Sequence, residues 1–433
     1  PGPVASAAVP ETPSETPSDT EPDTEPDTEP DTATQPGPDR PRRPLDGVLV
    51  VTLEQAVSAP LCTRHLADYG ARVIKIEPPG RGDFTRDYDD VVRGLAAHFV
   101  WVSRGKESLT LDLKSEPGIA VLHQLLAEAD VLVSNLGPGA VDRLGLGAGA
   151  LADRYPRLIT VTISGYGTGG TLEHKRAYDL LAQAEAGSCA ITGWPGQPAK
   201  PGIPIADVGT AMYAFSATLA ALYDRDRTGR GSAISVSMFD SMMEFMGYAL
   251  NHAQHSGRDQ APNGFSSPAV APYGAFRTSD GQTVVLGTTN DAEWRRLAAR
   301  VLGSDELAAD PRYAHNGDRL AHRAELDSVI GTWCAERPLA DIQAAADAAG
   351  IGNARHNTPT EVVAHPHLRE RNRWRTVETP AGPISALLPP PVVTGWEPSM
   401  GAIPALGAHT DRILAELGFS PDQVDQLRRD AVV

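Results

Sequence analysis

A single carboxylate interrupts a long run of apolar and small residues near the middle of the chain. Asp207 lies in the stretch KPGIPIADVGTAMYAFSATLAAL, which runs from Lys200 to Leu222 and reads as the start of a helix. Carboxylates are seldom buried unless they are paired or used chemically. Asp207 is therefore a helix cap, a buried structural acid or a reacting group, and the residues alone leave the three open.

Motifs for other common chemistries are missing or incomplete. The run GYGTGG (165–170) lacks the spacing and the strand-to-helix context of a dinucleotide fingerprint, and no phosphate-binding G-x-x-x-x-G-K-[ST] loop or G-x-S-x-G elbow occurs. No cysteine and histidine cluster has the spacing of a zinc site, so we expect no metal; His252 and His255 are expected to be a surface or core pair. Three cysteines far apart argue against a disulfide framework and favour a reducing cytoplasm.

Basic residues lie close to the ends of predicted strands. Each alone is a solvated surface charge, but together they could bind a polyanionic nucleotide; they are Arg72, Lys75, Lys106, Lys114, Arg143 and Arg176. The glycine-rich segment LGPGAVDRLGLG could also bring backbone amides close to a phosphate at the start of a helix.

The elements that must position these groups follow an α/β pattern. Apolar strands are predicted at 47–53, 72–77, 108–114, 130–135, 158–164 and 233–238, and helices at 59–71, 116–129, 208–228 and 239–255. This alternation predicts an open, mostly parallel sheet with helices on both faces. Ligands of such sheets bind beyond the carboxyl ends of the strands, which directs attention to the loops at 54–60, 78–83, 135–143 and 164–170.

The two ends of the chain differ from its centre. The first 40 residues hold ten acids and one base, so the net charge of −17 falls to about −8 for the rest, which does not suggest nucleic acid as a partner. We predict a disordered acidic tail rich in proline and threonine (1–43), a large domain (44–240), linker helices with a small α+β domain (241–372) and a C-terminal segment (373–433) that returns to the large domain. The small domain should contain a hairpin at 273–288 and helices at 291–302, 318–336 and 338–349. Neither a secretory signal nor a membrane partner is expected.

Many spaced motifs together resemble one family. The segments PLDGVLVVTLEQAVSAP, LADYGARVIKIEPPGRGDFTR, SRGKESLTLDLKSEPG, ADVLVSNLGPGAVDRLGLG, KRAYDLLAQAEAG, PGIPIADVGTAMYA and PALGAHTDRILAELG are similar, in order and spacing, to those of the class III coenzyme A transferases. The resemblance covers residues 44–433. It implies a large Rossmann-like domain and a small domain in a ring-like chain that threads its partner as an interlocked homodimer.

The same resemblance assigns roles to individual residues. It places Asp207 as the nucleophile that forms an aspartyl anhydride and then an aspartyl-CoA thioester. It implies CoA contacts at Gln55, Val57, Leu111, Lys114, Asn135, Leu136, Arg143 and Arg176, with the basic residues facing phosphates. Tyr178 and Asp179 should line the acyl pocket, the alternatives being core packing for Tyr178 and helix capping for Asp179. CoA thioesters are substrates here, and no permanently bound cofactor is expected.

Departures from related subfamilies narrow the expected activity. The α-methylacyl-CoA racemases, the alternative activity, use a histidine where this chain has Tyr178, and an arginine where it has Gly137. Formyl-CoA transferases have a lysine where this chain has Ser164, and a run of glycines where it has residues 261–274. The chain looks more like members that act on C4–C5 dicarboxylates, with Arg176 and His255 as candidates for binding the distal carboxylate. An inactive CoA-binding protein is the third hypothesis.

Overall fold

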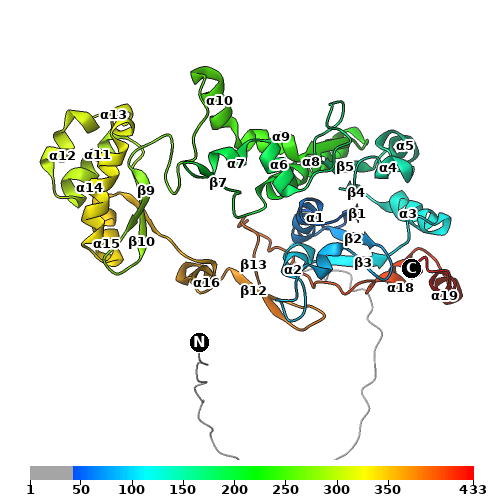
Figure 1. Cartoon of the computed structure of the whole chain (residues 1–433). Helices are drawn as coiled ribbons and strands as arrows, with labels where there is room; N and C mark the ends of the chain where they lie inside the picture. Colours follow the sequence, from blue (N-terminus) through cyan, green and yellow to red (C-terminus); the bar gives the residue numbers. More distant parts are fainter. Residues whose placement is uncertain (1–41) are drawn as a thin grey trace, which may run out of the picture. The chain divides into compact units, whose positions relative to one another are not determined.

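The computed structural model describes residues 42–433, so the predicted acidic tail (1–43) lies outside the described residues except for its last two. Six parallel strands form the central sheet, in the order β3-β2-β1-β4-β5-β8 (Figure 1). They are β1 (Leu49–Leu53), β2 (Arg72–Glu77), β3 (Lys106–Thr110), β4 (Val131–Ser134), β5 (Ile159–Ser164) and β8 (Ala233–Ser237). The prediction of an open parallel sheet is confirmed.

The strand order reverses between β1 and β4. From β1 the chain moves outward through β2 to β3, and it then returns to the other side of β1 to add β4, β5 and β8. The carboxyl ends of β1 and β4 therefore lie at the point where the strand order reverses, which is the usual ligand site of such sheets.

Helices cover both faces of this sheet (Figure 1). On one face α1 (Ser58–Asp68) and α8 (Ile205–Thr228) pack in a cluster with Val50, Val133 and Val161. On the other face α3 (Glu116–Glu128), α5 (Ala148–Arg154), α18 (Thr410–Glu416) and α19 (Pro421–Arg429) pack with Val51 and Leu132. Successive strand residues thus point to opposite cores, which explains why the strands read as continuous apolar runs.

The long helix α8 is apolar enough to meet a length and composition criterion for a membrane span, and half of its apolar window is buried in the fold. Ala211, Ala214 and Phe215 are buried in the hydrophobic cluster that α8 shares with α1. Gly229 ends α8 in a left-handed conformation with φ 73°, a conformation that glycine adopts without steric cost.

The edge strand β3 is completed by residues far along the sequence. Thr110 donates its backbone N–H to Thr410 Oγ1 (3.1 Å), and Gly407 donates its N–H to Ser108 Oγ (2.9 Å). β3 begins at Lys106 and ends at Thr110, whereas the sequence predicted a strand at 108–114. The strand ends early because Asp112 and Ser115 form the turn that caps α3, with Ser115 Oγ accepting the N–H of Gly118.

Residues 273–355 form an antiparallel sheet of β9 (Tyr273–Arg277), β10 (Thr283–Gly287) and β11 (Gly352–Arg355), with a helical layer built around Trp294. The predicted hairpin is confirmed.

Three of the predicted helices are each interrupted in the structure. The segment 239–255 divides into α9 (Met238–Phe245) and α10 (Gly247–Ser256), the segment 318–336 into α13 (Asn316–Ala321) and α14 (Arg323–Ala335), and the segment 291–302 into α11 (Asp291–Arg296) and η2 (Leu297–Val301). The first break falls before Gly247, whose helix propensity is low.

Candidate active site

Asp207 is the third residue of α8 and projects from the helix's first turn. The helix begins at Ile205 with Pro204 as its N-cap, so the interpretation of Asp207 as a cap for a helix starting at 208 is wrong. Its side chain is partly buried, and the hydroxyl of Ser58, at the start of α1, favours its ionised form and so lowers its pKa. The site therefore joins the first turns of two neighbouring helices.

A second carboxylate, Asp179, lies outside α8 and fixes the first turn of that helix by hydrogen bonds. One of its oxygens accepts the backbone N–H groups of Ala206 (3.1 Å) and Asp207 (3.4 Å), which have no partner within the helix. The other oxygen accepts a hydrogen bond from Gln183 Nε2 at 2.6 Å. Asp179 begins α6 (Asp179–Glu185) and caps α8 across space, in line with the alternative role considered for it.

Burial raises the pKa of Asp207, and the negative charge of Asp179 adds to this effect. The hydrogen bond from Ser58 and the charge of Lys200 lower the pKa in part, and the result is about 7. A carboxylate with such a pKa is a stronger base and nucleophile than a solvated aspartate, yet half of it is still ionised at neutral pH.

The loops that leave β1 and β4 are held together by Asn135. Its side-chain oxygen accepts the backbone N–H of Gln55 (2.8 Å), its amide donates to the Gln55 carbonyl (2.7 Å), and the same amide lies 3.4 Å from Ser58 Oγ. Ala56, which lies between Gln55 and Ser58 in the sequence, has a φ of 60°, a left-handed conformation uncommon for alanine. Asn135 thus holds a strained loop so that Ser58 faces Asp207.

Buried ion pairs hold the start of this loop. Glu54 Oε1 lies 2.5 Å from Lys106 Nζ and 3.3 Å from Lys75 Nζ, and Thr63 Oγ1 donates to Glu54 Oε2 at 2.5 Å. Burial alone would raise the pKa of Glu54, but the two lysines outweigh it and lower that pKa to about 2. Burial lowers the pKa of Lys106 to about 8. Both lysines are held in these ion pairs and are not available to a ligand. The prediction that Lys75 and Lys106 help to bind a nucleotide is therefore wrong.

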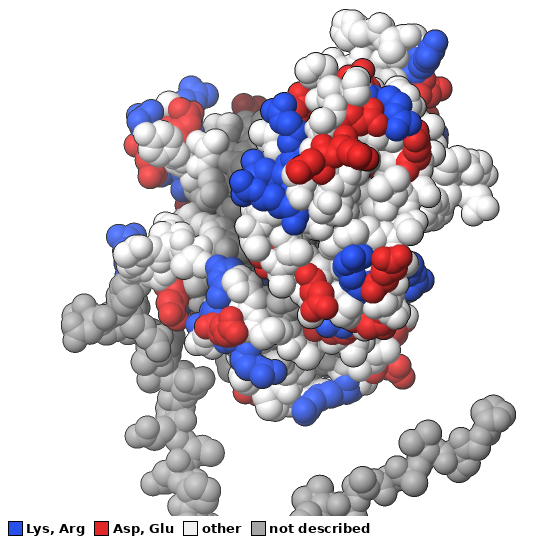
Figure 2. Space-filling model, turned by 90° about the vertical axis from the view of Figure 1, so that its left-hand side faces the viewer, with Lys and Arg blue, Asp and Glu red and all other residues white. Residues whose placement is uncertain are grey.

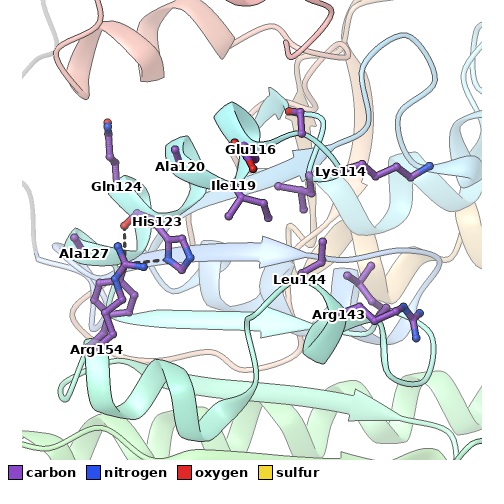
Figure 3. A pocket seen from close by; sticks show the side chains of 15 residues that line it. Lys114, Glu116, Ile119, Ala120, His123, Gln124, Ala127, Arg143, Leu144 and Arg154 are labelled. Atoms are coloured by element: carbon purple, nitrogen blue, oxygen red, sulfur yellow. Dashed lines mark hydrogen bonds between the residues drawn. The ribbon is translucent and has the colours of Figure 1, made fainter.

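A cavity of about 1270 Å³ lies between α3 and the crossover formed by α4 (Ala140–Arg143) and α5. Lys114, Leu136 and Arg143, three of the residues expected at the CoA nucleotide, line it. Figure 3 shows Lys114 and Arg143 at one end, and Arg154 and His123 at the other. The walls between them are mostly apolar, which suits a planar base flanked by phosphates.

The remaining predicted residues are more dispersed. Gln55 and Asn135 face one another as described. Val57 and Leu111 are buried, Leu111 within the core beside α3, while Arg176 is exposed and does not line the cavity. Tyr178 is 60% exposed, so core packing is not its role.

Sequence reasoning missed three residues that are coupled electrostatically to Asp207, namely Ser58, Lys200 and Tyr88. Lys200 Nζ lies 3.6 Å from Asp179 Oδ2. Burial raises the pKa of Tyr88, and the charges of Asp83, Asp207 and Tyr178 add to this. Lys200 lies seven residues before Asp207 in the same sequence stretch, so its charge could have indicated a site residue. Nothing in the sequence around Ser58 or Tyr88 indicated a role at the site.

Residues 45–410 match the protein family CoA-transferase family III. The chain belongs to this family. It is 40% identical to an acetyl-CoA:oxalate CoA-transferase of Acetobacter aceti over 71% of this chain and 79% of that protein. It is 33% identical to a succinyl-CoA–D-citramalate CoA-transferase of Chloroflexus aurantiacus over 91% of this chain and 99% of that protein. Together these similarities identify it as a family III CoA-transferase.

Solved structures of similar sequence share the fold of this chain. A CAIB/BAIF family protein from Brucella suis, 33% identical, matches with a TM-score of 0.76 over 87% of this chain and all of that one.

On the surface, acidic and basic side chains lie intermixed over the face shown in Figure 2. Within residues 42–433, no three histidine, cysteine, aspartate or glutamate side chains gather as a metal site would require.

Proposed function

We propose that this transferase moves CoA from an acyl-CoA to a C4–C5 dicarboxylate or a similar diacid, with Asp207 as the nucleophile. One observation carries the proposal. The Ser58 hydroxyl favours the ionised form of Asp207 and lies 3.4 Å from the side-chain amide of Asn135, and Leu136, the next residue, lines a cavity that has cationic side chains at its ends. In this proposal Asp207 reacts with the thioester end of the acyl-CoA, and the cavity holds the nucleotide at the other end.

The chemistry follows from the carboxylate. One oxygen of Asp207 attacks the thioester carbonyl carbon, the C–S bond breaks, and CoA leaves as a thiolate with a mixed anhydride remaining. The thiolate then attacks the Asp207 carboxyl carbon, which releases the donor acid and leaves an aspartyl-CoA thioester. The acceptor carboxylate repeats these steps in reverse order, and both the new acyl-CoA and the free Asp207 carboxylate are regenerated without net proton transfer.

The cavity provides the site for the nucleotide of CoA in this proposal. Lys114 and Arg143 are free of carboxylate partners within 4 Å among the described residues, so their charges can pair with phosphates. The apolar walls would hold the adenine. The pantetheine arm would then pass the Gln55–Asn135 contact on its way to Asp207.

The acceptor class rests on relatives. The Acetobacter protein is named for oxalate, the Chloroflexus protein for D-citramalate, and a mouse relative, 30% identical over 90% of this chain and of that protein, for glutarate. All three acids carry two carboxylates. We extend that shared feature to this chain.

A second copy of the chain is proposed to cover the exposed apolar side chains of α8, α9 and α10. These residues are Met212, Tyr213, Tyr223, Phe245, Tyr248 and Leu250, each at least 38% exposed. So large an apolar surface on three successive helices is typical of an interface. An interlocked homodimer, which the family resemblance implies, would stay dimeric when diluted to nanomolar concentration, and sedimentation at that concentration tests it.

The decisive experiment for the nucleophile is direct. Protein incubated with succinyl-CoA is digested at mildly acidic pH, and the peptide that contains Asp207 is examined by mass spectrometry for a CoA adduct. The adduct is expected in wild type and absent from Asp207→Asn. Wild type without an adduct across a panel of acyl-CoA donors, or an adduct that persists in Asp207→Asn, would contradict the mechanism.

A further inference from the structure

Lys200 places a positive charge beside Asp179, and this charge also lowers the pKa of Asp207. Its Nζ lies 3.6 Å from Asp179 Oδ2 and donates a hydrogen bond to the carbonyl of Pro201 at 3.1 Å. The side chain is 35% exposed, so the charge is only partly solvated. Lys200 reaches the site from the loop between β7 (Gln197–Pro198) and α8, the same loop that leads into Asp207.

Asp179 does not depend on Lys200 for its hydrogen bonds. Its two oxygens accept from Ala206, Asp207 and Gln183, and a separation of 3.6 Å from the ammonium is too long for a good hydrogen bond. Of the three donors on the ammonium, one is used by Pro201. Two donors therefore remain for a ligand.

The other cations considered for this role lie elsewhere. Among residues 42–433, neither Arg176 nor His255 forms an ion pair or hydrogen bond with Asp179 or Asp207. Lys175 is paired with Glu185 at 2.8 Å on the surface. Lys200 is thus the cation that the fold brings to the first turn of α8.

A diacid that attacks the aspartyl-CoA thioester with one carboxylate brings its second negative charge into a site that already holds the carboxylate of Asp179. That charge repels Asp179 unless a cation balances it, whereas a monocarboxylate brings no second charge. A flexible ammonium with free donors meets this need, and its attraction to Asp179 is weak enough to be exchanged for a ligand carboxylate.

We infer that Lys200 binds the distal carboxylate of the diacid and so selects dicarboxylates over monocarboxylates. This inference rests on the proposed transferase function. Lys200 acts on substrate binding and leaves the attack by Asp207 unchanged, so its loss should raise KM for the diacid far more than it lowers kcat.

The test is isotope exchange, which needs a single acid at a time. Full-length protein is incubated with succinyl-CoA and labelled succinate, and separately with acetyl-CoA and labelled acetate. Lys200→Gln should raise KM for succinate about 10- to 100-fold and change KM for acetate less than about twofold. Lys200→Arg should recover most of the succinate affinity. Lys175→Gln is the matched control and should match wild type with both acids.

Calorimetric binding of succinate in the presence of CoA adds a readout that needs no turnover, and thermal melting checks that each variant is folded. Equal KM and equal affinity for succinate in folded Lys200→Gln and wild type would overturn the inference while leaving the transferase proposal intact. A parallel loss with acetate would also overturn it, since charge selection would then be absent. A wild type that exchanges acetate but not succinate would overturn the choice of diacids together with this inference.

Discussion

The carboxylate of Asp179 reaches from α6 to the first turn of α8, where it lies 3.4 Å from the backbone nitrogen of Asp207. The same contact does two things. It satisfies helix N–H groups that would otherwise lack partners, which fixes where Asp207 projects. It also places a like charge near Asp207, which opposes ionisation of that side chain. Geometry and reactivity at Asp207 are therefore set by one residue.

Replacing Asp207 with Asn should remove activity and stabilise the fold. Transfer should fall on the order of 10³-fold or more, because the amide cannot form the anhydride. The folded-state pKa of about 7 lies above the ordinary value of 3.8, so wild type loses stability as pH rises from about 4 to 7. Asp207→Asn should avoid that loss and gain about 2 to 4 kcal/mol above pH 7. Urea unfolding of both proteins at pH 4 and pH 8 measures it; equal stability at pH 8 would contradict the buried-charge argument.

The pH dependence of transfer should report the ionisation of Asp207. Attack requires the carboxylate, so kcat/KM should rise about tenfold per pH unit below pH 7 and level off above it. Asp179→Asn keeps an oxygen to accept the helix N–H groups but removes the charge, so the midpoint should move to lower pH by about one unit. Initial rates between pH 5 and 9 test both, and a midpoint that moved upward would refute the assigned role of the Asp179 charge.

Removing the Ser58 hydroxyl should move the midpoint of the pH profile in the opposite direction, to higher pH. Its hydrogen bond favours the charged form of Asp207, so Ser58→Ala should raise the midpoint by about 0.5 to 1 pH unit. Ser216→Ala is the control, because that exposed serine bonds only to a carbonyl within α8. An unchanged profile in folded Ser58→Ala would show that the contact does not tune Asp207.

Lys114 and Arg143 should contribute to CoA affinity through phosphate charge. Each change to Gln should raise KM for acyl-CoA about tenfold and reduce its dependence on salt. The exposed Arg157→Gln is the control. Repeating the assay with dephospho-CoA thioesters identifies the residue at the 3′-phosphate, since its variant should no longer distinguish the two. No change in KM for either variant would place the nucleotide outside this cavity.

The regular part of the fold was predictable because it depends on local pattern. The apolar runs 72–77 and 158–164 became β2 and β5 to within one residue, and the helix predicted at 116–129 became α3. The breaks before Gly247 and at His322 were not predicted, because a helix pattern continues across both positions. Short elements such as α4 and α6 carry too few turns to show a period.

At the site, residue type and family likeness selected Asp207, but its surroundings required the fold. Ser58 lies about 150 residues before Asp207 and meets it only because α1 and α8 pack side by side. The basic residues Lys75 and Lys106 looked suitable for phosphates, yet they belong to a buried network around Glu54. Pairing of this kind depends on which strands are neighbours, and spacing along one chain does not reveal it.

The closing of strand β3 by residues some 300 positions later has a consequence for biosynthesis. During translation β3 emerges early, with one row of backbone groups unpaired until His409 and Thr410 leave the ribosome. For most of its synthesis the nascent chain therefore presents an open sheet edge that another polypeptide could extend. Such late pairing is slow to form, and it exposes the nascent enzyme to aggregation or to chaperone capture during that interval.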